Sequence, residues 1–249
     1  MHLGSPVFGD PREREKRFVG WLDSIKEETK TLYLIGDVFD FWFEYRKAVP
    51  RGFTRFLGKL AEFSDAGIEI HYFTGNHDVW VYDYLPEEIG LIVHRKPLVT
   101  EISGKTFYIA HGDGQGYNPF LFNLIRGIFH NRLCQFLFRL IHPDIGIKLA
   151  HTWANHSRMK EKKRTLPYLG EDKEHLVIYA KSYIREHPET NYLIFGHRHI
   201  LLDSMLTPQN RMVVIGDWLQ HFSYAVFDGE GLSLKSITNA DGTGNADFC

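Results

Sequence analysis

The sequence has little cysteine, no long uncharged run and almost no net charge, and each of these absences excludes a class of protein. Two cysteines, Cys134 and Cys249, are too few for a disulfide framework, which favours a reducing compartment such as the cytoplasm. No stretch of about 18 residues lacks charged side chains, so we expect neither a signal peptide nor a membrane span. A net charge of -2 argues against a protein that coats nucleic acid, so no nucleic-acid partner is expected.

What the chain does contain is a regular alternation of helical and strand patterns over 249 residues, 43% of them hydrophobic. Apolar spacing predicts helices over residues 12–28 and 53–63, each followed by an apolar strand that ends in a polar loop. Such alternation is typical of α/β folds. Further strands are expected in LVTEI and KTFYIA around a Ser-Gly turn, in YLIFGHRH (192–199), in RMVVIGDW (211–218), and in FSYAVFD and LSLKSI.

One long segment, residues 117–175, carries no strand signal. Of the 22 residues from Phe120 to Ile141, 14 are apolar, which is more than a single amphipathic stripe requires. A basic run, SRMKEKKR (157–164), comes after it. We therefore predict a core made of residues 1–116 and 176–249, with 117–175 as a helical lid insertion.

Four segments share one pattern, in which an apolar strand is followed by a loop that opens with potential metal ligands. They are LIGDVFD (34–40), YFTGNHD (72–78), YIAHGDG (108–114) and IFGHRH (194–199). In an open α/β sheet, ligands gather beyond the carboxyl ends of the strands, so these loops are expected to converge. The side chains that this would bring together are Asp37, Asn76, His111, His197 and His199.

The chemistry of this set is that of a catalytic metal site. Imidazole, carboxylate and amide ligands without thiolate suit Mn, Fe, Zn or Ni rather than a structural zinc site. A carboxylate can bridge two cations, and paired cations about 3.5 to 4 Å apart are the arrangement that supports phosphoryl transfer.

In their order and spacing, GDVFD, GNHD, HGD and GHRH resemble the signature of the calcineurin-like metallophosphoesterases, which begins with a further motif, Asp-x-His. MHLG at the start of the chain is similar to the end of that motif, with His2 as its histidine and the aspartate absent. Because the family's first strand is buried, we expect the natural reading frame to start upstream of Met1; a chain that starts at Met1 would lack one metal ligand. The resemblance implies a four-layer αββα sandwich and two divalent ions, with Mn²⁺ preferred and Fe²⁺, Zn²⁺ and Ni²⁺ as alternatives.

The resemblance also implies roles for these residues. Asp37 would bridge the two ions, His2 and His199 would serve the first ion, and Asn76, His111 and His197 would serve the second. His77 would be the catalytic histidine that takes up charge or donates a proton, with Asp78 as the carboxylate that holds it. Asp40 and Asp113 either orient a ligand or solvate a turn, and the sequence leaves both alternatives open.

Other conspicuous residues have a structural interpretation. The aromatic stretch FDFWFEY (39–45) is expected to pack in the core rather than to line a substrate base. The histidines outside the four motifs are interpreted as structural or surface residues: His71, His94, His130, His142, His151, His156, His175, His187 and His221.

The position of the insertion between HGD and GHRH, together with GDVFDFW, is similar to the UDP-2,3-diacylglucosamine hydrolases of lipid A biosynthesis. Many members of that family have arginine where this chain has His77. The resemblance implies hydrolysis of the diphosphate to UMP and lipid X (2,3-diacylglucosamine 1-phosphate), in the cytoplasm, by a protein in peripheral contact with the inner membrane. The implied substrate contacts are Asn76, His77, Ser157, Lys160 and Arg164.

Two other functions stay open at this stage. The same fold could act as a phosphodiesterase or pyrophosphatase on soluble nucleotides, with the insertion serving only as a cover. It could also be a metal-depleted scaffold, which the missing aspartate favours. The sequence leaves the oligomeric state undetermined.

Overall fold

The computed structural model describes residues 1–7, 9–116, 119–150, 152 and 168–237. The chain forms two compact units, of which unit 1 comprises residues 1–95 and 119–165 and unit 2 comprises residues 96–118 and 166–249. The proposed substrate contacts Ser157, Lys160 and Arg164 lie outside the described residues.

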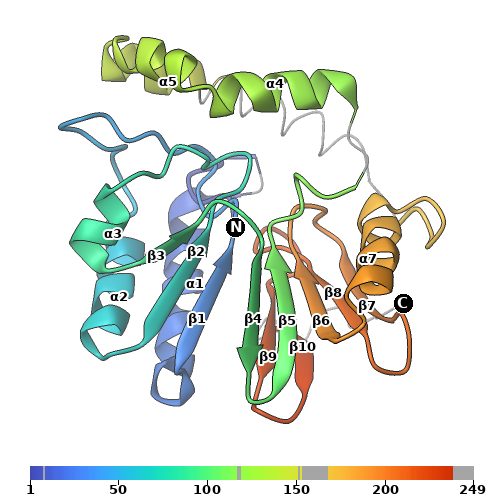
Figure 1. The fold of residues 1–249 in the computed structure, drawn as a ribbon. Helices are drawn as coiled ribbons and strands as arrows, with labels where there is room; N and C mark the ends of the chain where they lie inside the picture. Colours follow the sequence, from blue (N-terminus) through green and yellow to red (C-terminus); the bar gives the residue numbers. More distant parts are fainter. Residues whose placement is uncertain (8, 117–118, 151, 153–167, 238–249) are drawn as a thin grey trace. The chain divides into compact units, whose positions relative to one another are not determined.

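Unit 1 is built around a three-stranded parallel sheet in the order β1 (Thr31–Ile35), β2 (Glu69–Phe73), β3 (Ile92–His94). All three arrowheads in Figure 1 point toward the same edge of this sheet, where the loops after β1 and β2 begin. The helices of this part are α1 (Pro11–Ile25), the 3-10 turn η1 (Lys26–Glu28), α2 (Thr54–Asp65) and α3 (Tyr84–Ile89). The two predicted helices and the first two strands are confirmed, whereas α3 and β3 had no clear signal in the sequence.

A capping aspartate starts helix α1, and a glutamate of α1 caps the start of α2. The Asp10 carboxylate accepts a hydrogen bond from the Arg12 amide at 2.8 Å, and proline occupies the first turn. From the middle of α1, the buried Glu15 carboxylate accepts hydrogen bonds from the first-turn amides of α2, those of Arg55 and Phe56. The two helices therefore share a polar contact in addition to their apolar packing, and this contact satisfies amides at the start of α2 that have no partner within the helix.

Within the predicted insertion, most residues from 120 to 150 are helical, whereas 168–174 form turns and coil. Helix α4 (Phe120–His130) is followed directly by α5 (Arg132–Arg139), and residues 143–150 form a further helical stretch. Asn131 separates α4 from α5, because its side chain accepts hydrogen bonds from the amides of Leu133 and Cys134 and so starts a new helix. One apolar run in the sequence therefore forms two helices.

The aromatic stretch 39–45 packs in the interior, as predicted. Phe39, Trp42 and Phe43 are completely buried. A cluster formed by Phe41, Phe43, Tyr45, Val79 and Trp80 continues into the insertion, where it packs against Phe129, Phe138, Ile147 and Ala150. These aromatic contacts connect the loops after β1 and β2 to helices α4 and α5.

Unit 2 contains a mixed five-stranded sheet and a separate hairpin. The sheet order is β4 (Leu98–Ile102), β5 (Lys105–Ala110), β6 (Thr190–Phe195), β8 (Arg211–Ile215), β7 (Leu201–Met205). Strands β5, β6 and β8 are parallel to one another, and the antiparallel pair β9 (Ser223–Phe227) and β10 (Leu232–Ser236) forms the hairpin. The hairpins and strands β6 and β8 were predicted; β7 and α7 (His175–Glu186) were not.

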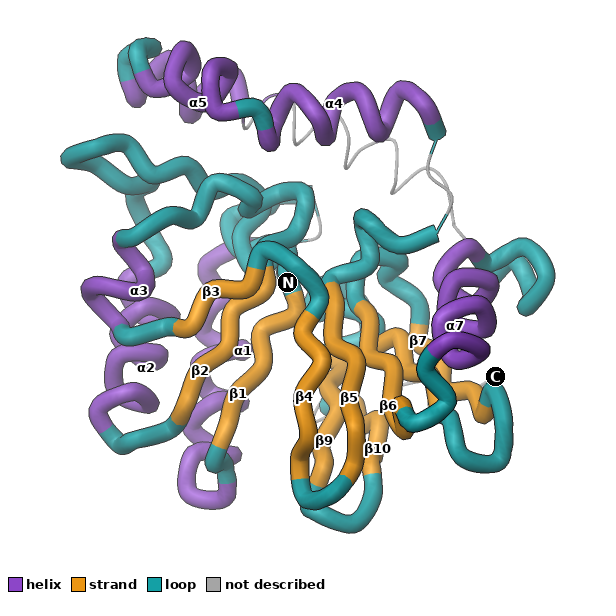
Figure 2. The backbone as a smooth tube through the Cα atoms, viewed as in Figure 1, coloured by secondary structure: helices purple, strands orange, loops and turns teal. Residues whose placement is uncertain are grey.

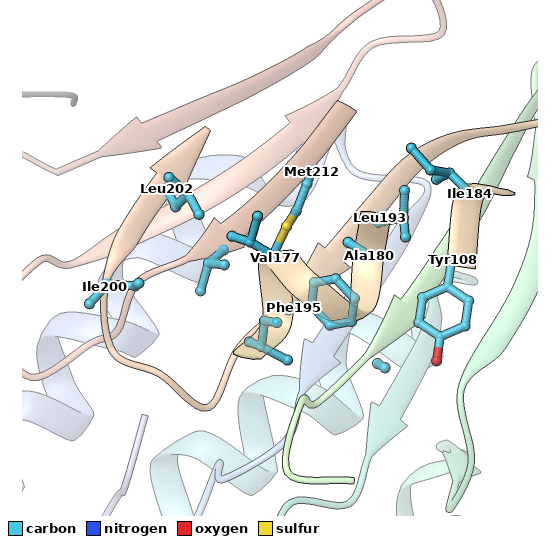
Figure 3. Packing of buried hydrophobic residues seen from close by; sticks show 12 residues of the cluster. Tyr108, Val177, Ala180, Ile184, Leu193, Phe195, Ile200, Leu202 and Met212 are labelled. Carbon is cyan, nitrogen blue, oxygen red and sulfur yellow. The ribbon is translucent and has the colours of Figure 1, made fainter. Parts of the chain in front are cut away.

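Helix α7 packs on this sheet through an apolar cluster. Figure 3 shows Val177, Ala180 and Ile184 of α7 among side chains from the neighbouring strands, including Leu193, Phe195 and Met212. Close-packed buried clusters of this kind make the strand positions rigid.

The α/β fold class is confirmed, since both units combine helices and strands (Figure 2) and both contain parallel strand pairs. Among the described residues, no helix is long and apolar enough to cross a membrane. In each unit the polar motifs directly follow parallel strands, so the candidate functional side chains stand at the ends of these strands.

Candidate metal centre

Unit 1 brings together candidate ligands from its N-terminal segment and from the loops after β1 and β2. His2 lies beside the loop after β1, because its amide donates to the Asp37 carbonyl at 2.8 Å and Leu3 forms a parallel bridge with Phe39. The imidazole of His2 lies between two carboxylates, with Nε2 3.6 Å from Asp37 Oδ2 and Nδ1 3.5 Å from Asp40 Oδ1. Ligand atoms of His2, Asp40 and His77 all lie within 4.8 Å of one another. His2, Asp37 and Asp40 are buried, so this corner of unit 1 concentrates acidic groups and imidazoles away from water.

Asn76 and Gly75 provide a direct test of whether this corner suits a cation. The Asn76 side-chain oxygen is buried and has no hydrogen-bond partner among the described residues. A buried amide oxygen without a donor is costly unless something electropositive binds it. At Gly75, a Cβ atom would stand 2.2 Å from Asp37 Oδ1, so glycine is needed for the carboxylate to lie this close to the backbone. These residues fit a metal ion.

Asp78 holds the loops after β1 and β2 to each other. Its Oδ2 accepts hydrogen bonds from Val38 N at 2.7 Å and from the Tyr72 hydroxyl at 2.5 Å, and its Oδ1 accepts one from Gly75 N at 2.7 Å. Burial raises the pKa of Tyr72 well above its usual value and the Asp78 carboxylate raises it further, so the hydroxyl stays protonated and donates. The Asp78 carboxylate is fully buried and binds backbone groups on either side of the candidate ligands.

His77 is held by the backbone around it. Its Nδ1 lies 3.0 Å from the Asp40 carbonyl oxygen, and its amide donates to Asp37 Oδ1 at 2.9 Å. The ring contacts the His2 ring edge-on, with centroids 4.9 Å apart. The family resemblance implies that Asp78 holds the His77 ring. The hydrogen bonds described above run from Asp78 to the loops that flank His77, so this pairing stays a prediction.

Unit 2 contains a second group of ligand candidates at the ends of β5 and β6. The rings of His111 and His197 lie edge-to-face with centroids 5.1 Å apart, and the Gly196 amide donates to the His111 carbonyl at 2.9 Å. A Cβ atom on Gly112 would stand 3.1 Å from the Cβ of His197, so glycine permits this close approach. The sequence prediction that these loops meet is correct for this pair.

His199 is oriented by Asp217, a residue that sequence analysis missed. The Asp217 carboxylate lies 3.1 Å from His199 Nδ1 and 3.3 Å from His221 Nδ1, and it also accepts from the Leu219 and Gln220 amides. Burial alone would raise the pKa of Asp217, but the hydrogen bonds from His199 and His221 lower it well below its usual range. The signal was present, because Gly-Asp follows β8 just as it follows β1.

Several candidate ligands have a backbone conformation that non-glycine residues rarely adopt. Among the described residues, seven non-glycine residues have positive φ, and four of them are predicted metal ligands. Such conformations cost about 1 to 3 kcal/mol each and are concentrated at functional sites. The four are His2 (φ 53°), Asp37 (φ 48°), His197 (φ 64°) and His199 (φ 53°).

An apolar cavity of about 390 Å³ opens beside the ligands of unit 1. Its polar lining comes from Asp40, Asn76 and His77, and the rest is supplied by the aromatic cluster and by helices of the insertion. The Trp80 indole N–H donates to the Phe129 carbonyl at 2.8 Å, which ties the end of α4 to the loop after β2. The lining residues are Asp40, Phe41, Asn76, His77, Val79, Trp80, Ile125, Ile128, Phe129, Phe138, Leu149 and Ala150.

Known proteins of similar sequence identify the family of this chain. No family model matches the sequence. It is 44% identical, over 252 residues that cover 96% of each chain, to a UDP-2,3-diacylglucosamine hydrolase from Porphyromonas gingivalis (strain W83). It is 25% identical over 225 residues, 88% of this chain and 89% of the relative, to a UDP-2,3-diacylglucosamine hydrolase from Ectopseudomonas mendocina. The crystal structure of TT1561 of Thermus thermophilus covers 90% of this chain and 92% of its own, at 15% identity and a TM-score of 0.42. At 44% identity over almost its entire length, the chain belongs to the UDP-2,3-diacylglucosamine hydrolase family.

Proposed function

We propose that this protein hydrolyses the diphosphate bond of UDP-2,3-diacylglucosamine and releases UMP and 2,3-diacylglucosamine 1-phosphate (lipid X). The observation that carries the proposal is the cavity of unit 1, in which three polar residues of the candidate centre adjoin an otherwise apolar lining. A nucleotide-linked glycolipid needs this combination, because its phosphates require charged partners and its acyl chains require apolar surface. Membership of the family agrees with this assignment.

The proposal includes two divalent ions. His2, Asp37 and Asn76 of unit 1 would hold them together with His111, His197 and His199 of unit 2, and Asp37 would bridge. Oxygen and imidazole donors without thiolate favour Mn²⁺, with Fe²⁺, Zn²⁺ and Ni²⁺ as alternatives. The bound ions would supply Lewis-acid stabilisation of the charge that develops on the phosphate oxygens.

His77 is the proposed catalytic residue. It lines the cavity, and contact between its Nδ1 and the Asp40 carbonyl favours the tautomer in which Nδ1 carries the proton. This hydrogen bond fixes the ring, so Nε2 is the nitrogen that can take up a proton and, once protonated, donate a hydrogen bond to a phosphate oxygen. We assign Asp78 the role of fixing the backbone on which His77 and Asn76 are carried. Ser157, Lys160 and Arg164 are kept as proposed substrate contacts.

Helices α4 and α5 are proposed to contact the cytoplasmic face of the inner membrane. They expose many large apolar side chains, and Phe120 is 81% exposed and Leu140, just after α5, 67% exposed. An exposed apolar surface of this extent on neighbouring helices is typical of an interaction site. Arg126 and Arg132 lie in the same two helices, and cations beside an apolar surface favour anionic lipid headgroups.

The activity is tested with metal-depleted protein to which Mn²⁺ is added back. We expect Mn²⁺-dependent release of UMP from UDP-2,3-diacylglucosamine, no hydrolysis of UDP-glucose or ADP-ribose, and loss of activity in His77→Ala. Equal rates on the soluble nucleotides would show that the acyl chains are not recognised. Turnover that persists after the protein has been stripped of metal would refute the metal-dependent assignment.

The cavity is tested by two substitutions of opposite effect. Ala150→Phe fills space on the insertion side, and Val79→Ala enlarges the cavity from the loop side. We expect Ala150→Phe to raise KM for long acyl chains while leaving hydrolysis of a short-chain analogue unchanged, and Val79→Ala to shift preference toward longer chains. Unchanged chain-length profiles in both folded variants would mean that the acyl chains bind elsewhere.

Membrane contact is tested by sedimentation with vesicles that contain phosphatidylglycerol. The double variant Phe120→Ser/Leu140→Ser should lose most vesicle binding, whereas Met205→Ser should retain it. Met205 is a suitable control because it is also an exposed apolar residue, at 57%, but belongs to β7 of unit 2. Equal binding by the double variant and the wild type would exclude the α4–α5 surface.

A further inference from the structure

A buried ion pair lies directly behind the GHRH motif of unit 2. Glu174 is completely buried and stands at the start of α7. Its two carboxylate oxygens accept from the Arg198 guanidinium, Oε1 from Nε at 2.7 Å and Oε2 from Nη2 at 3.0 Å. Only 11% of the Arg198 side chain is exposed. The contact is therefore bidentate and almost completely shielded from water. A bidentate contact of this kind constrains the orientation of an arginine strongly.

The ion pair holds a residue that lies directly between two candidate metal ligands. Arg198 stands between His197 and His199, and both histidines have the left-handed backbone conformation. The Arg198 amide donates to the Gly196 carbonyl at 2.7 Å, so the loop is tightly folded. Two strained residues flanking one arginine persist only if surrounding contacts hold the loop in place. The Glu174 carboxylate supplies such a contact from a rigid helix start.

The energetics argue against a purely stabilising role. Removing two charges from water is expensive, and well-packed apolar residues often stabilise a fold better than a buried ion pair does. Glu174 also lies beside another imidazole, with Oε1 3.4 Å from His175 Nδ1, and burial lowers the pKa of His175. A stabilising role would not require this pair to involve the residue between two candidate metal ligands.

We propose that Glu174 is a positioning residue that acts through Arg198 to hold His197 and His199 in the conformation that binds metal. This inference rests on the proposed function, since it takes the two histidines as ligands. Neither Glu174 nor Arg198 would bind the metal. Their pair would set metal affinity by removing alternative conformations of the loop, in the way that groups behind metal ligands commonly do.

The test is a Mn²⁺ titration of metal-depleted full-length protein, read by calorimetry and by the signal of unbound Mn²⁺ in electron paramagnetic resonance. Glu174→Gln keeps the shape of the side chain and removes its charge, and it should weaken Mn²⁺ binding about ten- to a hundredfold. Arg198→Lys, which keeps the charge but not the bidentate geometry, should give an intermediate affinity.

A matched control separates positioning from stability. Asp203 and Arg211 form a second bidentate pair in unit 2, between β7 and β8, with Oδ1 2.7 Å from Nε and Oδ2 2.5 Å from Nη2. Asp203→Asn should lower the melting temperature as a lost ion pair does, yet leave Mn²⁺ affinity within about twofold of the wild type. If Glu174→Gln does not fold, Glu174→Asp, which shortens the carboxylate but keeps its charge, takes its place in the comparison.

The possible results have distinct meanings. If the wild type binds two Mn²⁺ ions and Glu174→Gln binds them equally well, the positioning role is wrong and the proposed function stands. If Asp203→Asn weakens Mn²⁺ binding as much as Glu174→Gln does, the effect is one of general stability and the positioning role is again wrong. If the wild type binds no Mn²⁺, the proposed function fails, and this inference fails with it.

Discussion

Replacing Asp78 with asparagine changes the hydrogen-bonding capacity of a buried side chain that accepts from four groups of unit 1. The carboxylate accepts from Gly75 on one side and from Val38, Phe39 and the Tyr72 hydroxyl on the other. An amide has one accepting oxygen and one donating nitrogen, so it cannot accept on both sides. In either orientation the NH₂ group faces at least one backbone N–H that donates to the carboxylate in the wild type, and that N–H then has no acceptor.

The least damaging arrangement places the NH₂ group toward Gly75 and keeps the oxygen toward Val38 and Tyr72. The buried Gly75 amide then loses its acceptor, which costs about 1 to 3 kcal/mol. The two short remaining bonds, from Val38 N and the Tyr72 hydroxyl, change from charge-assisted to neutral at about 1 kcal/mol each, and the 3.4 Å contact from Phe39 N adds little. The free energy of unfolding should therefore fall by about 3 to 5 kcal/mol, a large part of the roughly 5 to 15 kcal/mol that a domain possesses.

Urea unfolding of the metal-depleted protein measures this loss, with Asp228→Asn as the control. Asp228 also accepts from two backbone amides, those of Glu230 and Gly231 at 2.9 Å, but it does so in an exposed hairpin turn. Its replacement should cost less than about 1 kcal/mol, because water can satisfy the released amides. A loss below about 1 kcal/mol in Asp78→Asn would refute the reasoning and would return Asp78 to a role on the His77 ring.

Three further outcomes are expected. Gly75→Ala should abolish Mn²⁺ binding in a titration, because its Cβ would overlap the Asp37 carboxylate; unaltered affinity would contradict the close approach. Gly58→Ala, in the middle of α2 with open space around it, should instead raise the free energy of unfolding by about 0.5 to 1 kcal/mol in urea, and a loss would show hidden crowding. Burial, and secondarily the charge of His71, lowers the pKa of His94, so the unfolded chain binds more protons near pH 6 and stability should fall as the pH drops below about 6.5. His94→Asn should flatten this dependence between about pH 5.5 and 7.5, and an equally steep profile in the variant would exclude His94 as its source.

Much of the fold could be predicted because the signals are local. Helix α1 follows from apolar residues at helical spacing after a capping aspartate and a proline, and β1 and β2 follow from short apolar runs. The short elements α3 and β3 carry too few residues for a periodic signal to emerge, and in the edge strand β7 the polar Asp203 and Ser204 interrupt the apolar run. Their formation depends on the neighbours against which they pair.

The sequence by itself determined the fold class, the family resemblance and the residue types of the candidate centre, because these depend on the order of the motifs and on the loop residues that come directly after each strand. The tertiary structure alone decided where the polar atoms point. Asp78 turns its carboxylate to the backbone of another loop, Asp217 orients His199, and Glu174 reaches Arg198 across 24 residues. Each acid also has neighbours in the chain, but nothing near it specifies the distant partners named here. Each carboxylate binds the donors that packing places within reach, and packing depends on contacts between segments that are distant in the sequence.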